Sequence, residues 1–263
     1  MYQPQTRVSD SAVIGAEALL RWRHPERGLV GPVEFIQVAE DSGLIEPIGQ
    51  WVLKEACAQL RRWQERGCPP ICVAVNISAR QLLDPEAFLE YVTRTYTECA
   101  VDPRQIELEM TESLLLDHVE ANAMMLRRLG QSGVRIAVDD FGTGYSSLSY
   151  IKRLPIDSIK TDRSFIRDIE TDRDDAEIIR AIIAMAHGLQ LRVTAEGVET
   201  TRQLGALKEL GCDEYQGYLV SEPIDAERFA ERFLNNSPVS DTPAKKPATS
   251  KVRLASVGGT RTK

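Results

Sequence analysis

The sequence has few histidines and no paired cysteines, which argues against several kinds of site. Its three histidines, His24, His118 and His187, are never four residues apart, so a histidine-based zinc site is not expected. Five cysteines are an odd number without a C-x-x-C pair, which predicts free thiols rather than a disulfide framework. No apolar run reaches the roughly 20 residues of a membrane span, and no secretory signal opens the chain. We therefore expect a cytoplasmic domain without membrane contact, whose full-length parent could still be tethered to a membrane.

Charge is spread unevenly over the 263 residues. Residues 237–263 hold six Lys and Arg against one acid, a net charge of +5. Since the whole chain has a net charge of −7, residues 1–236 carry a net charge of −12. This acidic body argues against a nucleic-acid groove, and we expect no DNA partner. Residues 237–263 also hold three prolines and show no hydrophobic period. The sequence thus predicts a single domain at 1–236 and a disordered basic tail at 237–263.

Short apolar runs alternate with longer amphipathic segments along the body. The runs expected to be strands are 13–22, 71–78, 105–111, 134–139, 157–161, 191–195 and 214–219. The segments expected to be helices are 47–66, 85–99, 113–130, 172–188, 200–210 and 225–234. Such alternation is typical of parallel βαβ units, and seven or eight of them closing on themselves predict an α/β fold of the TIM-like (β/α)8 barrel type.

Polar residues recur where these expected strands end, and most successive pairs are about one βα unit apart. They are Glu17, Asn76, Glu109, Asp139, Asp140, Lys160, Asp162, Glu196 and Gln216. The carboxyl ends of barrel strands converge on one mouth, so these side chains are expected to meet there. Oxygen donors without clustered His or Cys favour Mg²⁺ or Mn²⁺. Any one of these acids, taken alone, is equally compatible with a helix N-cap or a solvated loop end.

The alternation of side chains along a strand indicates which of them face the barrel interior. Glu107 and Glu109 share one face of their strand, opposite an apolar face that would pack on the outer helices. Lys160 and Asp162 share a face in the same way. A buried lysine needs an anionic partner or a metal-bound water. A structural ion pair of Lys160 with Asp162 or Asp140 is the alternative to a functional role.

Two glycines follow the paired aspartates, in the segment F-G-T-G-Y-S-S at 141–147. Gly142 and Gly144 would let backbone N–H groups approach a phosphate. As a motif, G-x-G alone is weak, because neither the dinucleotide-binding nor the P-loop pattern is completed. Its place directly after the two aspartates is the informative feature.

Seven short motifs occur in order along residues 2–234. They are E-A-L-L-R-W at 17–22, N-I-S at 76–78, E-M-T-E-S at 109–113, D-D-F-G-T-G at 139–144, K-T-D at 160–162, A-E-G-V-E at 195–199 and Q-G-Y at 216–218. This set resembles the EAL-domain cyclic di-GMP phosphodiesterases. The resemblance implies a TIM-like barrel enzyme of bacterial second-messenger signalling that hydrolyses cyclic di-GMP to linear pGpG. It also implies a two-metal site and a homodimer formed through the glycine-containing segment.

The resemblance further implies roles for individual residues. The expected ligands of Mg²⁺ or Mn²⁺ are Glu17, Asn76, Glu109, Asp139 and, for a second ion, Asp140. The residues expected to position or activate the attacking water are Glu196 and Lys160. Those expected to bind substrate are Leu20, Arg21, Asp162, Gln216 and Pro223. Those expected to brace the glycine-containing segment and the site's surroundings are Glu112, Glu199, Gly142 and Gly144. Ca²⁺ is expected to inhibit, because its larger radius and looser shell would spread the metal spacing.

Two positions depart from the family's usual pattern. Thr161 stands where an apolar residue is usual and is expected to point away from the mouth. Glu222 is an acid where a basic or neutral residue is more usual, which could weaken binding of a dianionic ligand. Two other functions remain open at this point: a cyclic di-GMP receptor without activity, and a barrel isomerase or lyase with Lys160 as base and a Mg²⁺-bound enolate.

Overall fold

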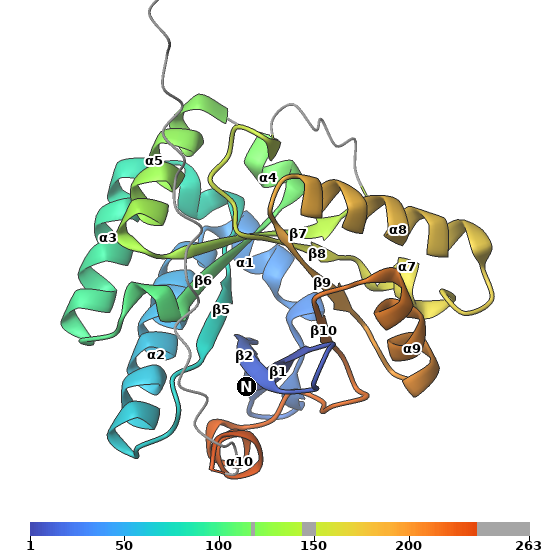
Figure 1. Cartoon of the computed structure of the whole chain (residues 1–263). Coiled ribbons are helices and arrows are strands. Elements are labelled where there is room, and N and C mark those ends of the chain that lie inside the picture. Colours follow the sequence, from blue (N-terminus) through green and yellow to red (C-terminus); the bar gives the residue numbers. More distant parts are fainter. Residues whose placement is uncertain (117–118, 144–150, 236–263) are drawn as a thin grey trace, which may run out of the picture.

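Eight strands close into a barrel in the computed structural model, which describes residues 1–116, 119–143 and 151–235 (Figure 1). Around the barrel the order is β1-β10-β9-β8-β7-β6-β5-β2. The strands are β1 (Tyr2–Arg7), β2 (Val13–Ala18), β5 (Cys72–Asn76), β6 (Ile106–Thr111), β7 (Arg135–Phe141), β8 (Ser158–Thr161), β9 (Arg192–Glu196) and β10 (Glu214–Gln216). The TIM-like barrel predicted from the alternation of segments is confirmed.

The first strand runs against all the others. β1 pairs antiparallel with both β2 and β10, whereas the remaining neighbours pair parallel. A connection of only five residues, 8–12, joins β1 to β2, and so short a link permits only an antiparallel pair. The sequence had predicted parallel units throughout. The reversal has a structural consequence, because it brings the amino end of β1 to the end of the barrel where the other strands finish.

Helices surround the barrel on all sides (Figure 1). They are α1 (Ile36–Ser42), α2 (Ile45–Glu65), α3 (Pro85–Glu98), α4 (Glu112–Leu116), α5 (Val119–Ser132), α7 (Arg163–Arg167), α8 (Arg173–Gly188), α9 (Thr201–Leu210) and α10 (Ala226–Phe229), which continues as the π-helix η4 (Ala230–Leu234). Side chains cap the amino ends of several helices: those of Asp84 and Asp172 accept from backbone N–H groups of α3 and α8. The helix expected over 113–130 is two helices, α4 and α5, and residues 117–118 between them lie outside the described residues.

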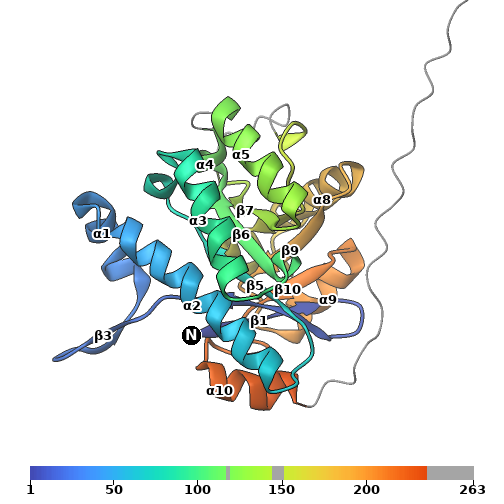
Figure 2. The same cartoon turned by 90° about the vertical axis from the view of Figure 1, so that its left-hand side faces the viewer.

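A small lobe stands beside the barrel between β2 and α2. It consists of the hairpin β3 (Trp22–His24) and β4 (Gly28–Val30), the 3-10 helix η1 (Pro32–Glu34) and α1, and Figure 2 shows it projecting from the barrel. The strand expected over 13–22 therefore ends at Ala18. Two further 3-10 helices, η2 (Ala79–Leu82) and η3 (Pro103–Gln105), precede α3 and β6.

The hydrophobic core lies between the strands and the surrounding helices. Ile106, Leu108 and Met110 belong to it, whereas Glu107 and Glu109 alternate with them on β6 and are also buried. The prediction that the two acids face inward is therefore consistent with the structure. The expected disorder of residues 237–263 concerns residues outside the described part of the chain. In that part, no helix is long and apolar enough to cross a membrane.

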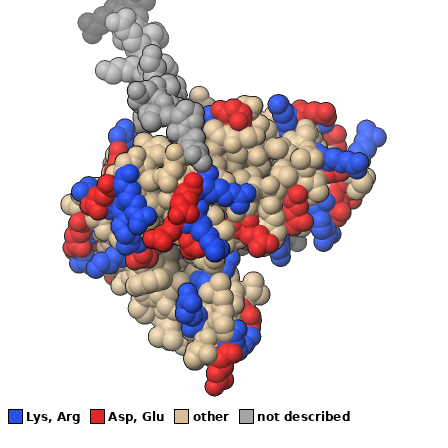
Figure 3. Space-filling model, turned by 90° about the horizontal axis from the view of Figure 1, so that it is seen from below, with Lys and Arg blue, Asp and Glu red and all other residues tan. Residues whose placement is uncertain are grey.

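The described surface carries charges of both signs. Figure 3 shows one face, on which Lys and Arg side chains lie interspersed with Asp and Glu side chains rather than gathered into one broad patch of either sign. Many of these charges form exposed pairs, such as Arg61 with Glu65 and Arg128 with Glu86. Pairs of this kind contribute little to stability. The buried charges inside the barrel are a different matter, because burial removes them from water.

Candidate active site

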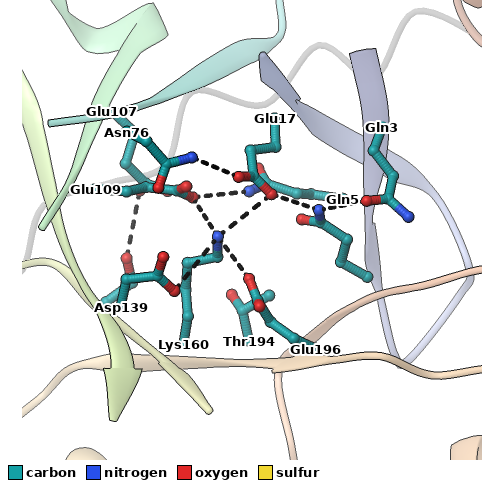
Figure 4. A network of polar contacts seen from close by, with 12 residues as sticks. Gln3, Gln5, Glu17, Asn76, Glu107, Glu109, Asp139, Lys160, Thr194 and Glu196 are labelled. Atoms are coloured by element: carbon teal, nitrogen blue, oxygen red, sulfur yellow. Dashed lines mark hydrogen bonds and ion pairs between the residues drawn. The ribbon is translucent and has the colours of Figure 1, made fainter. Parts of the chain in front are cut away.

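Lys160 occupies the centre of a group of carboxylates at the mouth of the barrel (Figure 4). Its Nζ lies 2.7 Å from Glu109 Oε1 and 2.6 Å from Glu196 Oε1. Glu17 Oε2 is 3.5 Å away and Asp139 Oδ1 is 3.7 Å away. We call these five residues the mouth cluster. They come from five strands, β2, β6, β7, β8 and β9, and each lies in the carboxyl-terminal part of its strand, which opens on the mouth.

The alternative ion pairs of Lys160 are absent among the described residues, because Lys160 pairs neither with Asp162 nor with Asp140. Burial acts to lower the pKa of Lys160, which is 1% exposed, but the surrounding carboxylates outweigh it and raise the pKa well above its usual value. Lys160 therefore lies among carboxylates that favour its charged form, and its closest ion pairs are those with Glu109 and Glu196.

The carboxylates of the mouth cluster outnumber the one cation. Burial, followed by the charges of Glu17 and other carboxylates, raises the pKa of Glu109 well above its usual value despite the opposing effect of Lys160. Burial likewise raises the pKa of Glu196 to about 8, although Lys160 opposes the shift. Glu109 Oε2 is buried and has no hydrogen-bond partner among the described residues. Crowding of carboxylates around one cation therefore disfavours their charged forms, and it leaves a buried acceptor, Glu109 Oε2, that no described residue satisfies.

Two side-chain amides hold Glu17. Asn76 Nδ2 donates to Glu17 Oε1 at 2.6 Å, and Gln216 Nε2 donates to Glu17 Oε2 at 2.6 Å. Burial acts to raise the pKa of Glu17, but Lys160 and these two amides outweigh it and hold the pKa below its usual value. These contacts favour the charged form of Glu17 and hold both of its oxygens in a fixed direction.

Asp139 and Asp140 lie in an irregularity of the barrel. The register between β7 and β8 shifts between Val138 and Phe141, and Asp140 has φ 52°, a left-handed conformation that is costly for a residue other than glycine. The bulge brings oxygens of both aspartates and of Glu196 within 4.8 Å of one another, a spacing that could hold a metal ion. Burial, followed by the charges of Asp139 and Asp162, raises the pKa of Asp140.

The residues predicted to bind substrate are placed less uniformly. Gln216 is 4% exposed and contacts Glu17 directly. Leu20 and Arg21 lie just beyond β2, where Arg21 Nη1 donates to the Leu20 carbonyl at 2.7 Å. Asp162 accepts from the Ser164 N–H at the start of α7, so its side chain caps that helix. Pro223 is half-buried in the segment after β10.

The residues predicted to brace the site lie at its edge. Glu112 begins α4 and is 5% exposed, and neither of its carboxylate oxygens has a hydrogen-bond partner among the described residues. Gly142 has φ 98°, and a Cβ there would lie 3.1 Å from the Phe165 ring, so this turn requires glycine. Glu199 is exposed, with its backbone N–H donating to Gln203 Oε1. Gly144 lies outside the described residues.

Two glutamines beside the mouth cluster were not predicted from the sequence. Gln3 Oε1 accepts from Gln216 Nε2 at 2.9 Å, and Gln5 Nε2 donates to Glu109 Oε1 at 3.4 Å. Both lie on β1 and face the barrel interior (Figure 4). Their polarity at alternate positions of Y-Q-P-Q-T-R was the available signal, but its meaning depends on the reversed direction of β1.

Fold and site together define an α/β-barrel protein with a carboxylate-rich polar site at the mouth. The EAL domain family model matches residues 1–223. The bifunctional diguanylate cyclase/cyclic di-GMP phosphodiesterase MucR of Pseudomonas aeruginosa is 44% identical over 228 residues, which are 87% of this chain and 33% of MucR. The cyclic di-GMP phosphodiesterase PdeR of Escherichia coli is 41% identical, over 90% of this chain and 36% of PdeR.

A solved structure of the MucR phosphodiesterase in complex with c-di-GMP superimposes on this chain with a TM-score of 0.83, at 44% identity, covering 87% of this chain and 92% of that one. The chain belongs to the EAL domain family. It spans about a third of the length of MucR and PdeR.

Proposed function

We propose that this domain hydrolyses one phosphodiester bond of cyclic di-GMP, giving linear pGpG, with Mg²⁺ or Mn²⁺ as cofactor. The observation that carries the proposal is the mouth cluster, in which four carboxylates from four strands surround Lys160. Two of them, Asp139 and Glu196, also lie with Asp140 in a group of three acids that have oxygens within 4.8 Å of one another. Relatives named as cyclic di-GMP phosphodiesterases, at 41–45% identity, support the same substrate.

The residues present fit divalent metal ions. Glu109 Oε2 is a buried acceptor without a partner among the described residues, and Asp139, Asp140 and Glu196 supply closely spaced oxygens. Carboxylate and amide oxygens suit hard cations such as Mg²⁺ and Mn²⁺. We assign one ion to Glu17, Asn76, Glu109 and Asp139, and a second to Asp139 and Asp140. When bound, such ions would neutralise the phosphate charge and favour a nucleophilic oxygen near neutral pH.

Within this scheme, Lys160 sets the geometry of the carboxylates. Its Nζ fixes one oxygen each of Glu109 and Glu196 at ion-pair distance, so the remaining oxygens keep a defined direction. Glu196 has the most exposed side chain of the four, 22% against 0% for Glu109. Glu196 is therefore the carboxylate that an entering water or phosphate meets first, which suits it to orient the attacking water.

Residues around the mouth cluster would hold the substrate. Gln216 presents an amide at the base of the site, and Leu20, Arg21 and Pro223 follow the ends of β2 and β10. Asp162 would contribute to substrate binding from the start of α7, where its side chain also caps the helix. Glu112 and Glu199 would brace the segment that begins at Gly142.

The direct test is hydrolysis of cyclic di-GMP by the purified chain, with Mg²⁺, with Mn²⁺, with Ca²⁺ and after chelation. We expect pGpG with Mg²⁺ or Mn²⁺, none after chelation, and inhibition by Ca²⁺. Glu17→Ala is expected to abolish turnover while the domain stays folded, because Glu17 supplies oxygens to the site and little to the core.

Other outcomes would change the assignment. Binding of cyclic di-GMP without hydrolysis under every metal condition would indicate a receptor, and turnover that survives chelation would contradict the metal assignment. The remaining proposals concern the context of the domain: a homodimer formed through residues 141–148, of which 144–148 lie outside the described residues, and a location in the cytoplasm.

A further inference from the structure

Gln3 sits at the mouth because β1 is reversed. It pairs in register with Glu17 on β2, and its side chain points into the barrel beside the mouth cluster (Figure 4). Only 8% of Gln3 is exposed. A buried amide at this position must satisfy both a donor and an acceptor, and its two contacts decide how the neighbouring groups are oriented.

The hydrogen bonds of Gln3 form a chain with one permitted direction. Gln3 Nε2 donates to the Ser221 backbone carbonyl at 3.2 Å, and Gln3 Oε1 accepts from Gln216 Nε2 at 2.9 Å. The same Gln216 nitrogen donates its other hydrogen to Glu17 Oε2 at 2.6 Å. A backbone carbonyl can only accept, so it turns the Gln3 amide with its nitrogen outward and its oxygen toward Gln216.

A flipped Gln216 amide would place its oxygen against two acceptors, Gln3 Oε1 and the Glu17 carboxylate. Both contacts would then be repulsive, so Gln3 and Glu17 together fix the amide of Gln216 in one orientation. That orientation leaves Gln216 Oε1 buried without a hydrogen-bond partner among the described residues. An acceptor held in this state is ready for a donor group on a bound ligand.

We propose that Gln3 is a positioning residue, which fixes the Gln216 amide, aligns Glu17 through it, and ties both to the segment that begins at Ser221 and contains Pro223. This inference rests on the proposed function and adds a residue to it. Glu17 is held on its other oxygen by Asn76, so loss of the Gln3 contact would loosen one of its two supports. A displacement on the order of 1 Å at a reacting group can lower a rate about 100-fold.

The test compares Gln3→Met, Gln216→Met and the double variant, because methionine keeps the length of the side chain and removes its hydrogen bonds. Readouts are kcat and KM for cyclic di-GMP, the dissociation constant of Mn²⁺ measured by calorimetry without substrate, and the melting temperature. We expect Gln3→Met to lower kcat/KM by about 10-fold to 100-fold and to weaken Mn²⁺ binding. The double variant should be no worse than Gln216→Met alone, since Gln3 acts through Gln216.

Gln105 provides a matched control. It also accepts from a glutamine, Gln64 Nε2 at 2.6 Å, and donates to a backbone carbonyl, that of Ile71 at 3.2 Å, but it precedes β6 and so lies at the opposite end of the barrel. Gln105→Met should change the melting temperature only. Equal Mn²⁺ affinity in Gln3→Met and wild type, or losses that multiply in the double variant, would overturn the proposal.

A second variant covers the case in which Gln3→Met does not fold. Gln3→Glu keeps an acceptor toward Gln216, so its dissociation constant for Mn²⁺ should lie within about threefold of the wild-type value. Its KM for cyclic di-GMP should rise, because the ionised side chain cannot donate to the Ser221 carbonyl. Mn²⁺ affinity as low as that of Gln216→Met would contradict the proposal. Absence of hydrolysis by the wild type would instead refute the proposed function, and the Mn²⁺ measurements would still test Gln3.

Discussion

The two ends of the barrel interior both bury charges, but they balance them differently. At the end opposite the mouth, Arg192 pairs with Glu107 and Glu214, while Ser158 and Thr194 donate to the same two carboxylates. We call these five residues the lower cluster. Each of its carboxylates has a cation and a hydroxyl donor from the chain. In the mouth cluster, one lysine faces four carboxylates.

Glu107 and Glu109 lie on the same strand but differ in how their charges are balanced. They lie two residues apart on β6, face the same interior and are both buried. Glu107 accepts from Ser158 and pairs with Arg192, whereas Glu109 shares Lys160 with three other carboxylates. Donors of the chain therefore match the buried carboxylates of the lower cluster, whereas those of the mouth cluster outnumber their one cation, as the proposed cation and substrate site requires.

The largest effect is expected from Lys160→Met. The substitution keeps most of the side-chain volume but removes the only described cation within ion-pair distance of the mouth carboxylates. We expect kcat to fall by about 10²-fold to 10⁴-fold, because Glu196 and Glu109 lose their common anchor. Steady-state hydrolysis of cyclic di-GMP measures it, with the exposed Lys152→Met as control. A kcat near that of wild type would show that Lys160 serves stability alone.

Metal binding should separate Glu109 from Glu107. At a Mg²⁺ concentration 100 times the dissociation constant, we expect the wild-type free energy of unfolding to rise by about 2.7 kcal/mol. Glu109→Gln should lose most of that gain, and Glu107→Gln should keep it, since Glu107 lies in the lower cluster. Thermal unfolding with and without Mg²⁺ gives the answer. If both variants respond to Mg²⁺ alike, the division between the two clusters is wrong.

Arg192→Met tests the other end. Removing one partner of a fully buried ion pair costs about 3–5 kcal/mol, and since the Arg192 side chain is 35% exposed we expect a smaller loss, about 2 kcal/mol. Chemical denaturation measures it. The kcat per folded molecule should stay within about threefold of wild type. A large fall in kcat with little change in stability would reverse the roles assigned to the two clusters.

Much of this arrangement could be predicted from the sequence, because local patterns dictate it. The caps Asp84 and Asp172 start α3 and α8, and the alternation on β6 places Glu107 and Glu109 inside. The convergence of Glu17, Glu109 and the others could be predicted because parallel barrel strands end at one mouth.

Other features depend on contacts between distant segments. The direction of β1 follows from its pairing with β2 and β10, so Y-Q-P-Q-T-R alone did not place Gln3 at the mouth. The choice of Lys160's partners also depends on tertiary structure: Asp162, its neighbour in sequence, caps α7 instead. The shift of register at Asp139 and Asp140 likewise has no signal in the sequence of β7 alone.

The smallest effect is expected at Thr161, which alternates with Lys160 on β8 and so faces away from the mouth cluster. Its hydroxyl is buried, with the residue 1% exposed, and Oγ1 has no hydrogen-bond partner among the described residues. Burying an unsatisfied hydroxyl costs free energy, so Thr161→Val should raise the free energy of unfolding by about 1 kcal/mol, or the melting temperature by about 2–4 °C.

Thr194→Val is the matched comparison for that prediction. The Thr194 hydroxyl donates to Glu214 Oε2 at 3.2 Å inside the lower cluster, so its removal should destabilise the domain by about 1 kcal/mol. Opposite signs in thermal unfolding would show that a threonine contributes here only where its hydroxyl meets a carboxylate. Because Thr161 faces away from the site, Thr161→Val should also leave kcat unchanged. Equal destabilisation in the two variants would contradict the prediction, because it would mean that the Thr161 hydroxyl does stabilise the folded domain.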